Sequence, residues 1–398
     1  MFNALNLNNS GKKFLLSLET KGIKLGLKRT KQLFKVCGNP EKDLNSVQII
    51  GTNGKGSTAA TLSSILFESG MKVGLYTSPH LIDLSERIQI NNQPISNKFI
   101  NYFTESFNKD IEFFECTFFE TLTAMAAYYF KDQGVDIAIF ETGLGGKFDS
   151  VTACNSQLQL FTKISMDHSH ILGNSVEGIA KDKACAIHLN SVCYSVAQEH
   201  DVAKILLDKA KEQCAEISFN LENYSQQTIP ALFGNHQIEN SRLAITAAKH
   251  ITNVTDNNIH KGLSNVKWPG RVELLQDSPS VYFDVSHNDD SIIAFCNAIK
   301  SLDHQYTKTL IISVQKTKII KKSISILENM FSNIIITKLN DRMYSTQILS
   351  SMFSNQTQIK IIKNPSTAIT NTLKNIQKND LLAIIGSHYW GDYVYKNF

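Results

Sequence analysis

The sequence predicts a two-domain α/β protein. Residues 1–267 are expected to form a P-loop-type domain on a doubly wound, mostly parallel sheet, and residues 268–398 a smaller Rossmann-like α/β domain. Short apolar runs alternate with helix-length segments, which is typical of parallel βαβ units. A glycine-rich segment at 51–57 follows a strand and opens a helix. A second series of strand-like runs begins near 281, after the Pro-Gly pair within 267–271.

Apolar runs and helical spacing define the elements of the first domain. A helix is expected over 57–69, with Leu62, Ile65 and Leu66 inward and a glycine just past its end. A second helix is expected over 118–130. Strands are expected at 46–50, 72–76, 136–140 and 158–162.

The second domain contains five strand candidates separated by helix-length segments, which is the pattern of a further parallel sheet. These candidates are 281–284, 309–313, 333–337, 359–362 and 381–385.

Composition excludes several classes of protein. The 398 residues are 42% hydrophobic and 19% charged, which is ordinary for a globular chain. A net charge of +4 is too small to mark a nucleic-acid or membrane-surface binder. No run approaches about 18 uninterrupted apolar residues. We therefore expect no nucleic acid and no membrane among the partners.

The seven cysteines are scattered and include no C-x-x-C pair. This argues against a disulfide framework and a zinc ribbon, and it fits a reducing compartment. The first ten residues lack a basic region leading into an apolar one, so we expect a cytoplasmic protein.

The strongest chemical signal is Gly51-Thr-Asn-Gly-Lys-Gly-Ser57. Such a loop turns backbone N–H groups toward phosphate oxygens at a helix N-terminus. Lys55 can neutralise charge on the β- and γ-phosphates, and Ser57 can hold Mg²⁺. Because Gly56 separates the two, this is not a strict Walker A motif. The alternative is a glycine-rich turn with a capping serine.

Three polar clusters follow the carboxyl ends of expected strands, where ligands bind in open α/β sheets. Glu141, after an apolar strand, has the position of a metal-binding carboxylate. His168 is a candidate ligand, although a lone histidine is also common as a structural or surface residue. The clusters are Ser78–Leu81 with Glu86–Ile88, Glu141–Gly146 with Asp149, and Asp167–His168 with Lys181–Lys183.

Taken in order, these motifs resemble the dihydrofolate synthase/folylpolyglutamate synthase family of the Mur ligase superfamily. The resemblance covers nearly the whole chain, and the loop matches the family's GTNGKGS form. The other matching segments are 22–27, 38–40, 77–81, 86–91, 117–120, 141–146, 167–168, 179–184, 234–237 with Asn240, 268–271, 284–288 and 386–387.

The resemblance implies an ATP site and two Mg²⁺ sites. Lys183 would be carbamylated, which turns an ammonium into the oxygen donor that Mg²⁺ prefers; the alternative is an ordinary solvated helix lysine. The implied ATP residues are Gly54, Lys55, Gly56, Ser57, Asn240 (at the adenine), Arg271, Asp284 and His287. The implied metal ligands are Ser78 and Glu141 for one ion, and His168 and Lys183 for the other.

The resemblance also implies a dihydropteroate site. A flat heteroaromatic ring needs an aromatic wall, for which Phe119 is a candidate; the alternative is that Phe118 or Phe119 is a core residue. The implied residues are Lys24, Leu25, Gly26, Thr117, Phe118, Phe119, Glu120, Phe148, Asp149 and Ser150.

Three segments depart from the family pattern. After Gly145 and Gly146 the chain reads Lys147-Phe-Asp149, and Thr152 stands at the end of this loop, where the family usually has an asparagine. The family's DGAHNP reads Asp284-Val-Ser-His-Asn-Asp289, and an aspartate-bearing segment reads Gln315-Lys-Thr-Lys318. These changes put the folate or glutamate pocket in question, not the phosphate loop.

The implied activity is an ATP-dependent C–N ligase, monomeric, that joins L-glutamate to dihydropteroate and to reduced folates through an acyl phosphate. Three alternatives stay open: a folylpolyglutamate synthase without the first activity, another Mur-type amino-acid ligase, and a nucleotide-binding switch. The GTNGKGS form and the segment 22–27 favour the folate branch over a cell-wall ligase, and we expect no UDP-binding domain before the loop.

Overall fold

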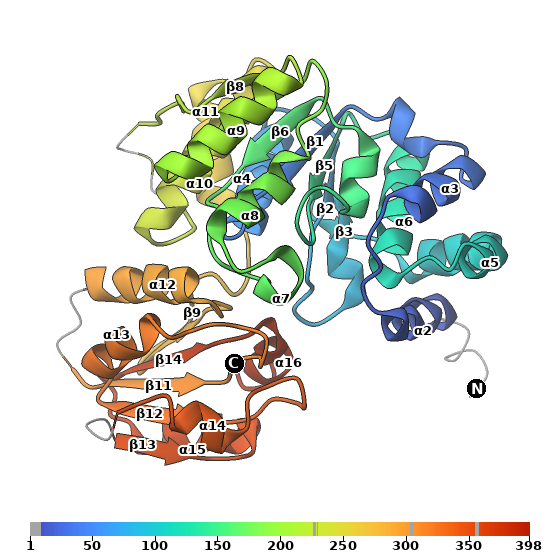
Figure 1. Cartoon of the computed structure of the whole chain (residues 1–398). Helices are drawn as coiled ribbons and strands as arrows, with labels where there is room; N and C mark the ends of the chain where they lie inside the picture. The colour runs from blue at the N-terminus through green and yellow to red at the C-terminus, as the bar shows by residue number, and fades with distance from the viewer. Residues whose placement is uncertain (1–8, 226–227, 229, 303–305, 355–357) are drawn as a thin grey trace. The chain divides into compact units, whose positions relative to one another are not determined.

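The computed structural model describes residues 9–225, 228, 230–302, 306–354 and 358–398 (Figure 1). The expectation that the first ten residues carry no targeting signal concerns a segment that lies mostly outside the described residues. Backbone contacts divide the chain into two compact units. The first unit runs through Ile164 and includes Ser175–Pro230 and Glu239–Val266; the second is Ser165–Asn174, Ala231–Ile238 and Lys267–Phe398. The domain boundary expected between residues 267 and 268 stays a prediction.

Within the described residues, the first unit contains an eight-stranded sheet in the order β4-β3-β2-β5-β1-β6-β7-β8. All neighbours are parallel except β3, which pairs antiparallel with both β2 and β4. The predicted mixed, mostly parallel α/β class is confirmed. The strands are β1 (Ser46–Ile50), β2 (Val73–Tyr76), β3 (Ile88–Ile90), β4 (Gln93–Pro94), β5 (Ile137–Glu141), β6 (Leu158–Phe161), β7 (Val192–Ser195) and β8 (Glu216–Ser218).

The order of these strands places the first chemical motif at a reversal in the sheet. From β1 the chain crosses to β2, later returns to β5 on the near side of β1, and then continues with β6 on its far side. The loops after β1, β5 and β6 therefore leave neighbouring strands at one edge, which is where α/β sheets bind ligands.

The helices of the first unit pack on this sheet. Its α-helices are α2 (Ser10–Ser17), α3 (Lys28–Val36), α4 (Lys55–Glu68), α5 (Asn97–Phe113), α6 (Phe118–Gln133), α8 (Val176–Ala184), α9 (His200–Glu212), most of α10 (Asn235–Ile251) and α11 (Asp256–Asn265). Its 3₁₀ turns are η1 (Leu18–Lys21), η2 (Pro40–Asp43), η3 (Leu84–Arg87) and η4 (Ser150–Cys154).

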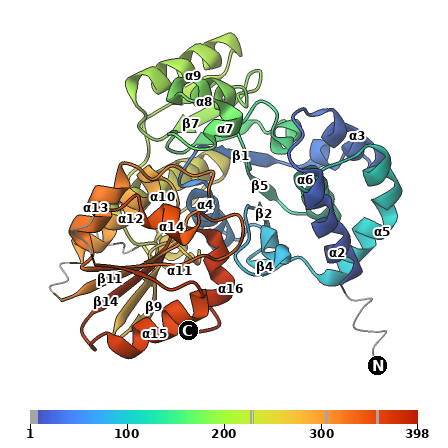
Figure 2. The same ribbon diagram turned by 60° about the horizontal axis from the view of Figure 1, so that its bottom comes forward.

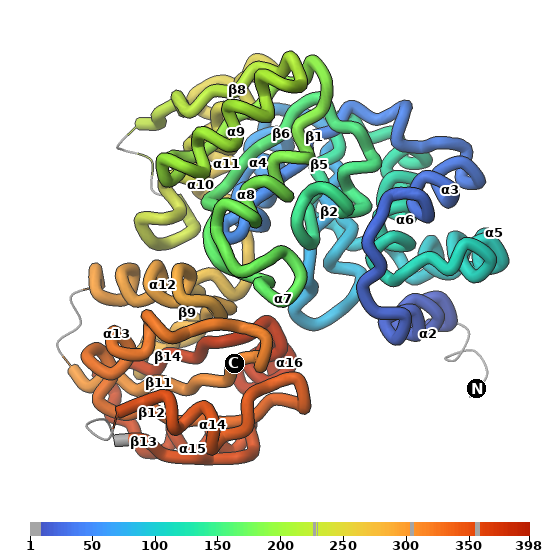
Figure 3. Tube along the Cα trace, viewed as in Figure 1, coloured from blue at the N-terminus to red at the C-terminus, as the bar shows by residue number. Residues whose placement is uncertain are grey.

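Helix α4, which follows the glycine-rich loop, is buried from Gly56 to Leu66. It contacts the sheet at β1, β2 and β5, and helix α11 covers its other side, as the trace in Figure 3 shows. The two helices approach closely because Gly262 has no side chain: a Cβ there would lie 2.6 Å from the Cα of Ile65. The first turn of α4 is therefore held rigidly by both layers.

Helices α2, α3, α5 and α6 form a second group around the same sheet (Figure 2). They surround an aromatic and aliphatic core that includes Phe103 and Phe130, both fully buried. Helix α6 begins with a capping box between Thr117 and Glu120 and ends at Gly134 in the left-handed conformation.

Within the described residues, the second unit has a six-stranded sheet in the order β13-β12-β11-β14-β10-β9, parallel except for β9 against β10. Its strands are β9 (Glu273–Asp277), β10 (Ser280–Phe283), β11 (Lys308–Ile312), β12 (Asn333–Ile336), β13 (Gln358–Ile361) and β14 (Leu381–Ile385). Its helices are α7 (Ser169–Leu172), α12 (Asp289–Ser301), α13 (Ser323–Met330), α14 (Thr346–Ser350), α15 (Pro365–Asn375), η5 (His388–Trp390) and α16 (Gly391–Val394).

The expected elements and the observed ones differ in two informative places. The helix expected from 57 begins at Lys55, because Gly54 takes a left-handed conformation (φ 90°) and so ends the loop two residues earlier. Strands β3, β4, β7, β8 and β9 were not expected. The first four have two to four residues each, too few to show a period in the sequence.

All seven cysteines are unpaired, and five are buried: Cys37, Cys116, Cys154, Cys193 and Cys296. Burial raises the pKa of Cys37, Cys116, Cys193 and Cys296 to about 12. Among the described helices, none is long and apolar enough to span a bilayer.

Candidate functional site

The glycine-rich loop closes tightly on itself at the end of β1. The ammonium of Lys55 donates to the carbonyl of Thr52 at 3.1 Å, so the side chain folds back over the loop. Gly56 and Ser57 are buried in the first turn of α4. The loop therefore leads directly into the N-terminus of α4, where Lys55 and Ser57 lie in the first turn. This is the arrangement of an anion-binding site.

Asn240 lies directly against this loop. A Cβ on Gly54 would come within 2.4 Å of the side-chain oxygen of Asn240. Asn240 is itself buried and comes from helix α10. The structure thus brings together two residues that lie far apart in the sequence.

Lys183 is also part of this region. It is buried on α8, and its ammonium donates to the carbonyl of Gly51 at 2.7 Å. The solvated-lysine alternative is therefore wrong, because only 5% of the residue is exposed. Lys183 reaches the start of the phosphate loop from a helix that begins 125 residues later in the chain.

Ser78 and Glu141 meet beside the loop. Glu141 is the last residue of β5, and its carboxylate accepts a hydrogen bond from the backbone N–H of Ser78 at 2.9 Å. The neighbouring Thr142 N–H bonds to Ile49, so the end of β5 is fixed to β1. A buried carboxylate and a serine in contact provide the oxygen donors that Mg²⁺ prefers.

Asp149 caps the short η4 turn after the second glycine-rich segment. Its carboxylate accepts from the N–H groups of Leu144 and Val151 at 2.8 and 2.9 Å. Burial raises the pKa of Asp149 to about 6, while those hydrogen bonds and the charge of Lys183 act in the opposite direction. The carboxylate is therefore held by backbone dipoles rather than by a paired cation.

Phe119 forms a wall over the same loop. A Cβ on Gly143 would lie 2.4 Å from the Phe119 ring, so the ring sits directly on this glycine. Tyr76 packs beside it, with ring centroids 5.7 Å apart. Phe118 points elsewhere: the guanidinium of Arg87 lies 5.2 Å from its ring centroid. Both rings are half-buried against the core of the unit.

Arg29, which no sequence motif marks, connects the two halves of the predicted dihydropteroate site. Its Nε donates to the Glu120 carboxylate at 3.0 Å, and its Nη2 donates to the carbonyl of Lys24 at 2.7 Å. Glu120 in turn accepts from the N–H of Thr117 at 2.8 Å. The 24–26 segment is thus fixed beside the start of α6. Leu25 is exposed there, and Gly26 has a φ of 121°.

The residues that depart from the family pattern have structural partners. The Thr152 hydroxyl donates to the Gly146 carbonyl at 2.7 Å and accepts from Gln48 at 2.9 Å. Thr152 therefore closes the loop that an asparagine usually closes. Phe148 is 41% exposed, with the Lys147 ammonium 5.0 Å from its ring centroid. Ser150 is buried against Thr123.

In the second unit, Asp284 directly follows β10, and its side chain is hydrogen-bonded to the backbone. Its two carboxylate oxygens accept from the N–H groups of Val272 and Ser286 at 2.8 and 2.7 Å. Arg271 donates to the carbonyl of Gly270 at 3.1 Å. His287 bonds through Nδ1 to the carbonyl of Val285 at 2.8 Å, and burial lowers its pKa.

Asp167 and His168 belong to the second unit by their contacts, although they follow β6 of the first. Lys318, noted in the sequence only as part of a departure, donates to both Asp167 oxygens at 2.8 and 3.0 Å. Burial would raise the pKa of Asp167, but a hydrogen bond with His287 and the charge of Lys318 hold it well below its usual range. No signal in the sequence marked Lys318 as buried.

The two predicted metal sites fit unequally. Ser78 and Glu141 are in contact and offer oxygen. His168, by contrast, has Nε2 3.2 Å from the Lys318 ammonium, and Lys183 is a hydrogen-bond donor as an ammonium. Over the described part of the chain, no three or more His, Cys, Asp or Glu side chains gather into a metal cluster.

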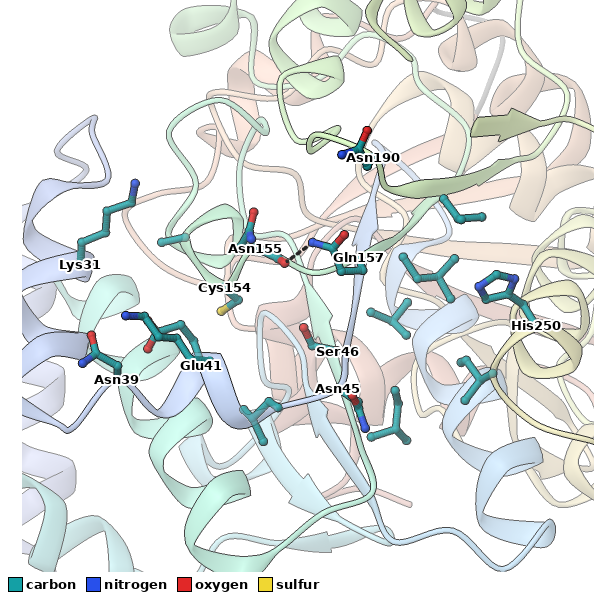
Figure 4. Close-up of a pocket in the computed structure, with 18 residues that line it drawn as sticks. Lys31, Asn39, Glu41, Asn45, Ser46, Cys154, Asn155, Gln157, Asn190 and His250 are labelled. Carbon is teal, nitrogen blue, oxygen red and sulfur yellow. Dashed lines mark hydrogen bonds between the residues drawn. The ribbon is translucent and has the colours of Figure 1, made fainter. Parts of the chain in front are cut away.

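A crevice of about 790 Å³ lies at the opposite, amino edge of the first sheet (Figure 4). Asn39, Asn155 and Asn190 line it in left-handed conformations, which asparagine tolerates, so turn geometry accounts for them. Its described lining includes none of the predicted site residues. The crevice is therefore separate from the site at the carboxyl edge.

A family model described as Mur ligase, glutamate ligase domain, matches residues 270–388. The dihydrofolate synthase/folylpolyglutamate synthase of Bacillus subtilis is 35% identical over 341 residues, covering 77% of this chain and 79% of that protein. The folylpolyglutamate synthase of Lacticaseibacillus casei is 31% identical over 313 residues, covering 70% and 73%.

Other relatives are longer. The chain covers 40% of the probable bifunctional folylpolyglutamate synthase/dihydropteroate synthase of Halobacterium salinarum, with 31% identity over 325 residues.

Solved structures agree with the fold. Mycobacterium tuberculosis folylpolyglutamate synthase complexed with ADP superposes with a TM-score of 0.88 at 24% identity, covering 98% of this chain and 99% of that one. E. coli FolC in complex with DHPP and ADP gives 0.86 at 25% identity, covering 97% of each. The resemblance seen in the sequence is confirmed: the chain belongs to the dihydrofolate synthase/folylpolyglutamate synthase family of Mur ligases.

Proposed function

We propose that this chain is an ATP-dependent ligase that adds L-glutamate to dihydropteroate and to reduced folates. The observation that carries the proposal is the grouping at the carboxyl edge of the first sheet. There the phosphate loop, the Ser78–Glu141 contact and the Asp149 loop all follow neighbouring strands. The B. subtilis relative, which covers most of both chains, is named for both activities.

The phosphate loop is the ATP end of the proposed site. Gly54, Gly56 and Ser57 would present N–H groups to the phosphates, and Lys55 would turn from the Thr52 carbonyl toward them. ATP phosphorylates the substrate carboxylate and leaves as ADP, and the neutral glutamate amine then attacks the acyl phosphate and displaces inorganic phosphate. Lys55 stabilises the charge that grows on the transferring phosphoryl group.

Two Mg²⁺ ions belong to the proposal. When bound, Mg²⁺ supplies charge neutralisation at the phosphates. Ser78 and Glu141 would hold one ion, and their oxygen donors suit it. His168 and a carbamylated Lys183 would hold the second. The buried position of Lys183 at the start of the loop supports its selection over Lys181, which is exposed.

The acceptor side lies between α6 and the Asp149 loop. Phe119 supplies an aromatic face, and Asp149 and Thr117 supply polar groups for ring nitrogens. Arg29 fixes Lys24, Leu25 and Gly26 at the same end of α6. The remaining members of the proposed dihydropteroate set are Phe118, Glu120, Phe148 and Ser150.

Asn240, which lies against Gly54, would meet the adenine, as the resemblance implies. Arg271, Asp284 and His287 would serve the phosphates and ribose. We propose that the protein acts as a cytoplasmic monomer.

Release of ADP by the purified full chain tests the proposal in three mixtures with ATP and Mg²⁺. Dihydropteroate plus glutamate and tetrahydrofolate plus glutamate should each give ADP and a glutamylated product of matching amount. ATP with neither acceptor should give almost none. Turnover with tetrahydrofolate alone would leave a folylpolyglutamate synthase, and steady turnover without glutamate would indicate a nucleotide-dependent switch.

A further inference from the structure

A partly buried cluster in the second unit engages Nε2 of His168. Lys318, 5% exposed, follows β11, and its ammonium lies between the carboxylate of Asp167 and the ring of His168. Asn288 donates to Asp167 from the other side at 3.1 Å. Every one of these contacts lies within the second unit.

The chemistry of the two groups fixes the direction of the hydrogen bond. An ammonium has three N–H donors and no acceptor, so Nε2 of His168 must accept from Lys318 at 3.2 Å. The neutral ring then carries its proton on Nδ1. Because each ring nitrogen has one lone pair or one proton, neither nitrogen of His168 has a lone pair left for a metal ion.

We propose that Lys318 and a divalent cation compete for Nε2 of His168. The ammonium of Lys318 engages the lone pair of Nε2 that a divalent cation would need, and the ring becomes a ligand only when that hydrogen bond breaks. The proposal rests on His168 being a metal ligand, as in the proposed function.

The exchange needs only a small movement. Lys318 bonds to both oxygens of Asp167, at 2.8 and 3.0 Å, so it keeps its counter-ion when it releases the ring. Asp167 is fixed in turn by Asn288 and by the N–H of His168 at 2.7 Å. The ion pair therefore holds the ammonium near the ring, where its charge also opposes a bound cation.

Binding of Mn²⁺, used as a paramagnetic probe in place of Mg²⁺, tests the proposal on the full chain without nucleotide. Electron paramagnetic resonance measures free Mn²⁺ during the titration. Lys318→Met removes the donor and the charge while keeping much of the side-chain volume. A charged hydrogen bond of ordinary strength predicts Mn²⁺ affinity higher by about tenfold or more. Lys316→Met, at an exposed lysine of the same loop, should bind as the parent does.

Two further variants separate competition from its alternatives. Loss of Lys318 leaves Asp167 buried without its cation, which could unfold the segment or create a new acidic ligand. The double variant Asp167→Asn with Lys318→Met removes both charges, and it should keep the gain in affinity. Adding His168→Ala to Lys318→Met should abolish the gain.

Several results would overturn the proposal. These are unchanged or weaker Mn²⁺ binding in folded Lys318→Met, a gain that disappears in the double variant, and a gain that survives His168→Ala. The ADP-release assay is independent of this titration. Absence of glutamate-dependent turnover with a gain in Mn²⁺ affinity would reject the ligase function and leave the competition in place.

Discussion

Two buried aspartates, one in each unit, are held in opposite ways. Asp149 accepts from backbone N–H groups, and burial raises its pKa to about 6. Asp167 is paired with Lys318, and its pKa lies well below the usual range despite burial. Peptide dipoles at Asp149 offset only part of the cost of burying a charge, whereas an ammonium at Asp167 more than offsets it.

The buried lysines show the same contrast. Lys183 donates to a neutral carbonyl, that of Gly51, and Lys318 donates to a carboxylate. Deprotonation of an ammonium that faces a carboxylate would leave a buried negative charge without a counter-ion. Deprotonation of an ammonium that faces a neutral carbonyl leaves no such unpaired charge. Asp149 and Lys183 can therefore change protonation state when a ligand binds, whereas Asp167 and Lys318 stay charged as an ion pair. This difference favours Lys183 over Lys318 as the lysine that is carbamylated.

Removing the cation of the phosphate loop should have the largest effect on activity. Lys55→Ala should lower the rate of ligation by on the order of 10²-fold or more, because the transferring phosphoryl group loses a stabilising charge. ADP release with dihydropteroate and glutamate measures the loss. The melting temperature should match that of the parent. Near-parental turnover by the folded variant would reject the phosphate-loop assignment.

Lys183→Ala tests whether that lysine acts through a carbamate. We expect activity to fall by about 10- to 100-fold, as for loss of a residue that supports a metal site. Bicarbonate or short-chain carboxylates should restore part of it by supplying the missing oxygen. Lys181→Ala, two residues earlier on the same helix and exposed, is the matched control and should keep parental activity. Equal losses at the two positions, or no rescue, would contradict the carbamate.

The pKa of Asp149 predicts a pH dependence of stability. Since its folded pKa is raised above the ordinary aspartate value, its contribution to stability is present below about pH 4 and is lost as the pH rises through about 6. Relative to Asp149→Asn, the parent should lose about 1 to 3 kcal/mol of unfolding free energy over that interval. Urea unfolding at pH 4, 5, 6 and 7 measures this difference, and a constant difference would contradict the raised pKa.

The smallest effect concerns the aromatic wall at Gly143. The two acceptors share a pterin but differ in where the reacting carboxylate lies, so one enzyme must bind the pterin in two places. Phe119→Ala should then impair dihydropteroate ligation about tenfold more than folate elongation, since positioning governs such rates. Phe113→Ala, 81% exposed, is the control. Equal losses in the two reactions would remove the argument for two poses.

The fold could be predicted from the sequence where burial leaves a pattern. The run at 381–385 is apolar, and the run at 46–50 is apolar except for Ser46 and Gln48, because both faces of these strands are covered; they form β14 and β1. The edge strand β8 is half exposed and three residues long, so neither periodicity nor composition distinguishes it from a loop. Sheet order comes from contacts between distant segments, which no local pattern contains.

The candidate site could be predicted where a motif is contiguous. The phosphate loop and Glu141 follow from their positions after strands. Arg29 and Lys318 could not be found in this way, since each acts on segments about 90 and 150 residues away. A lysine in a polar loop also gives no sign that it will be 5% exposed.

The burial of the cysteines has a practical consequence for spectroscopy. Thiols react as thiolates, so five of the seven are doubly protected, by burial and by raised pKa values. Cys214, after helix α9, is exposed, and Cys185, at the end of α8, is partly so. A maleimide dye would therefore attach first at Cys214, and the native sequence already offers a position for a single fluorescent reporter.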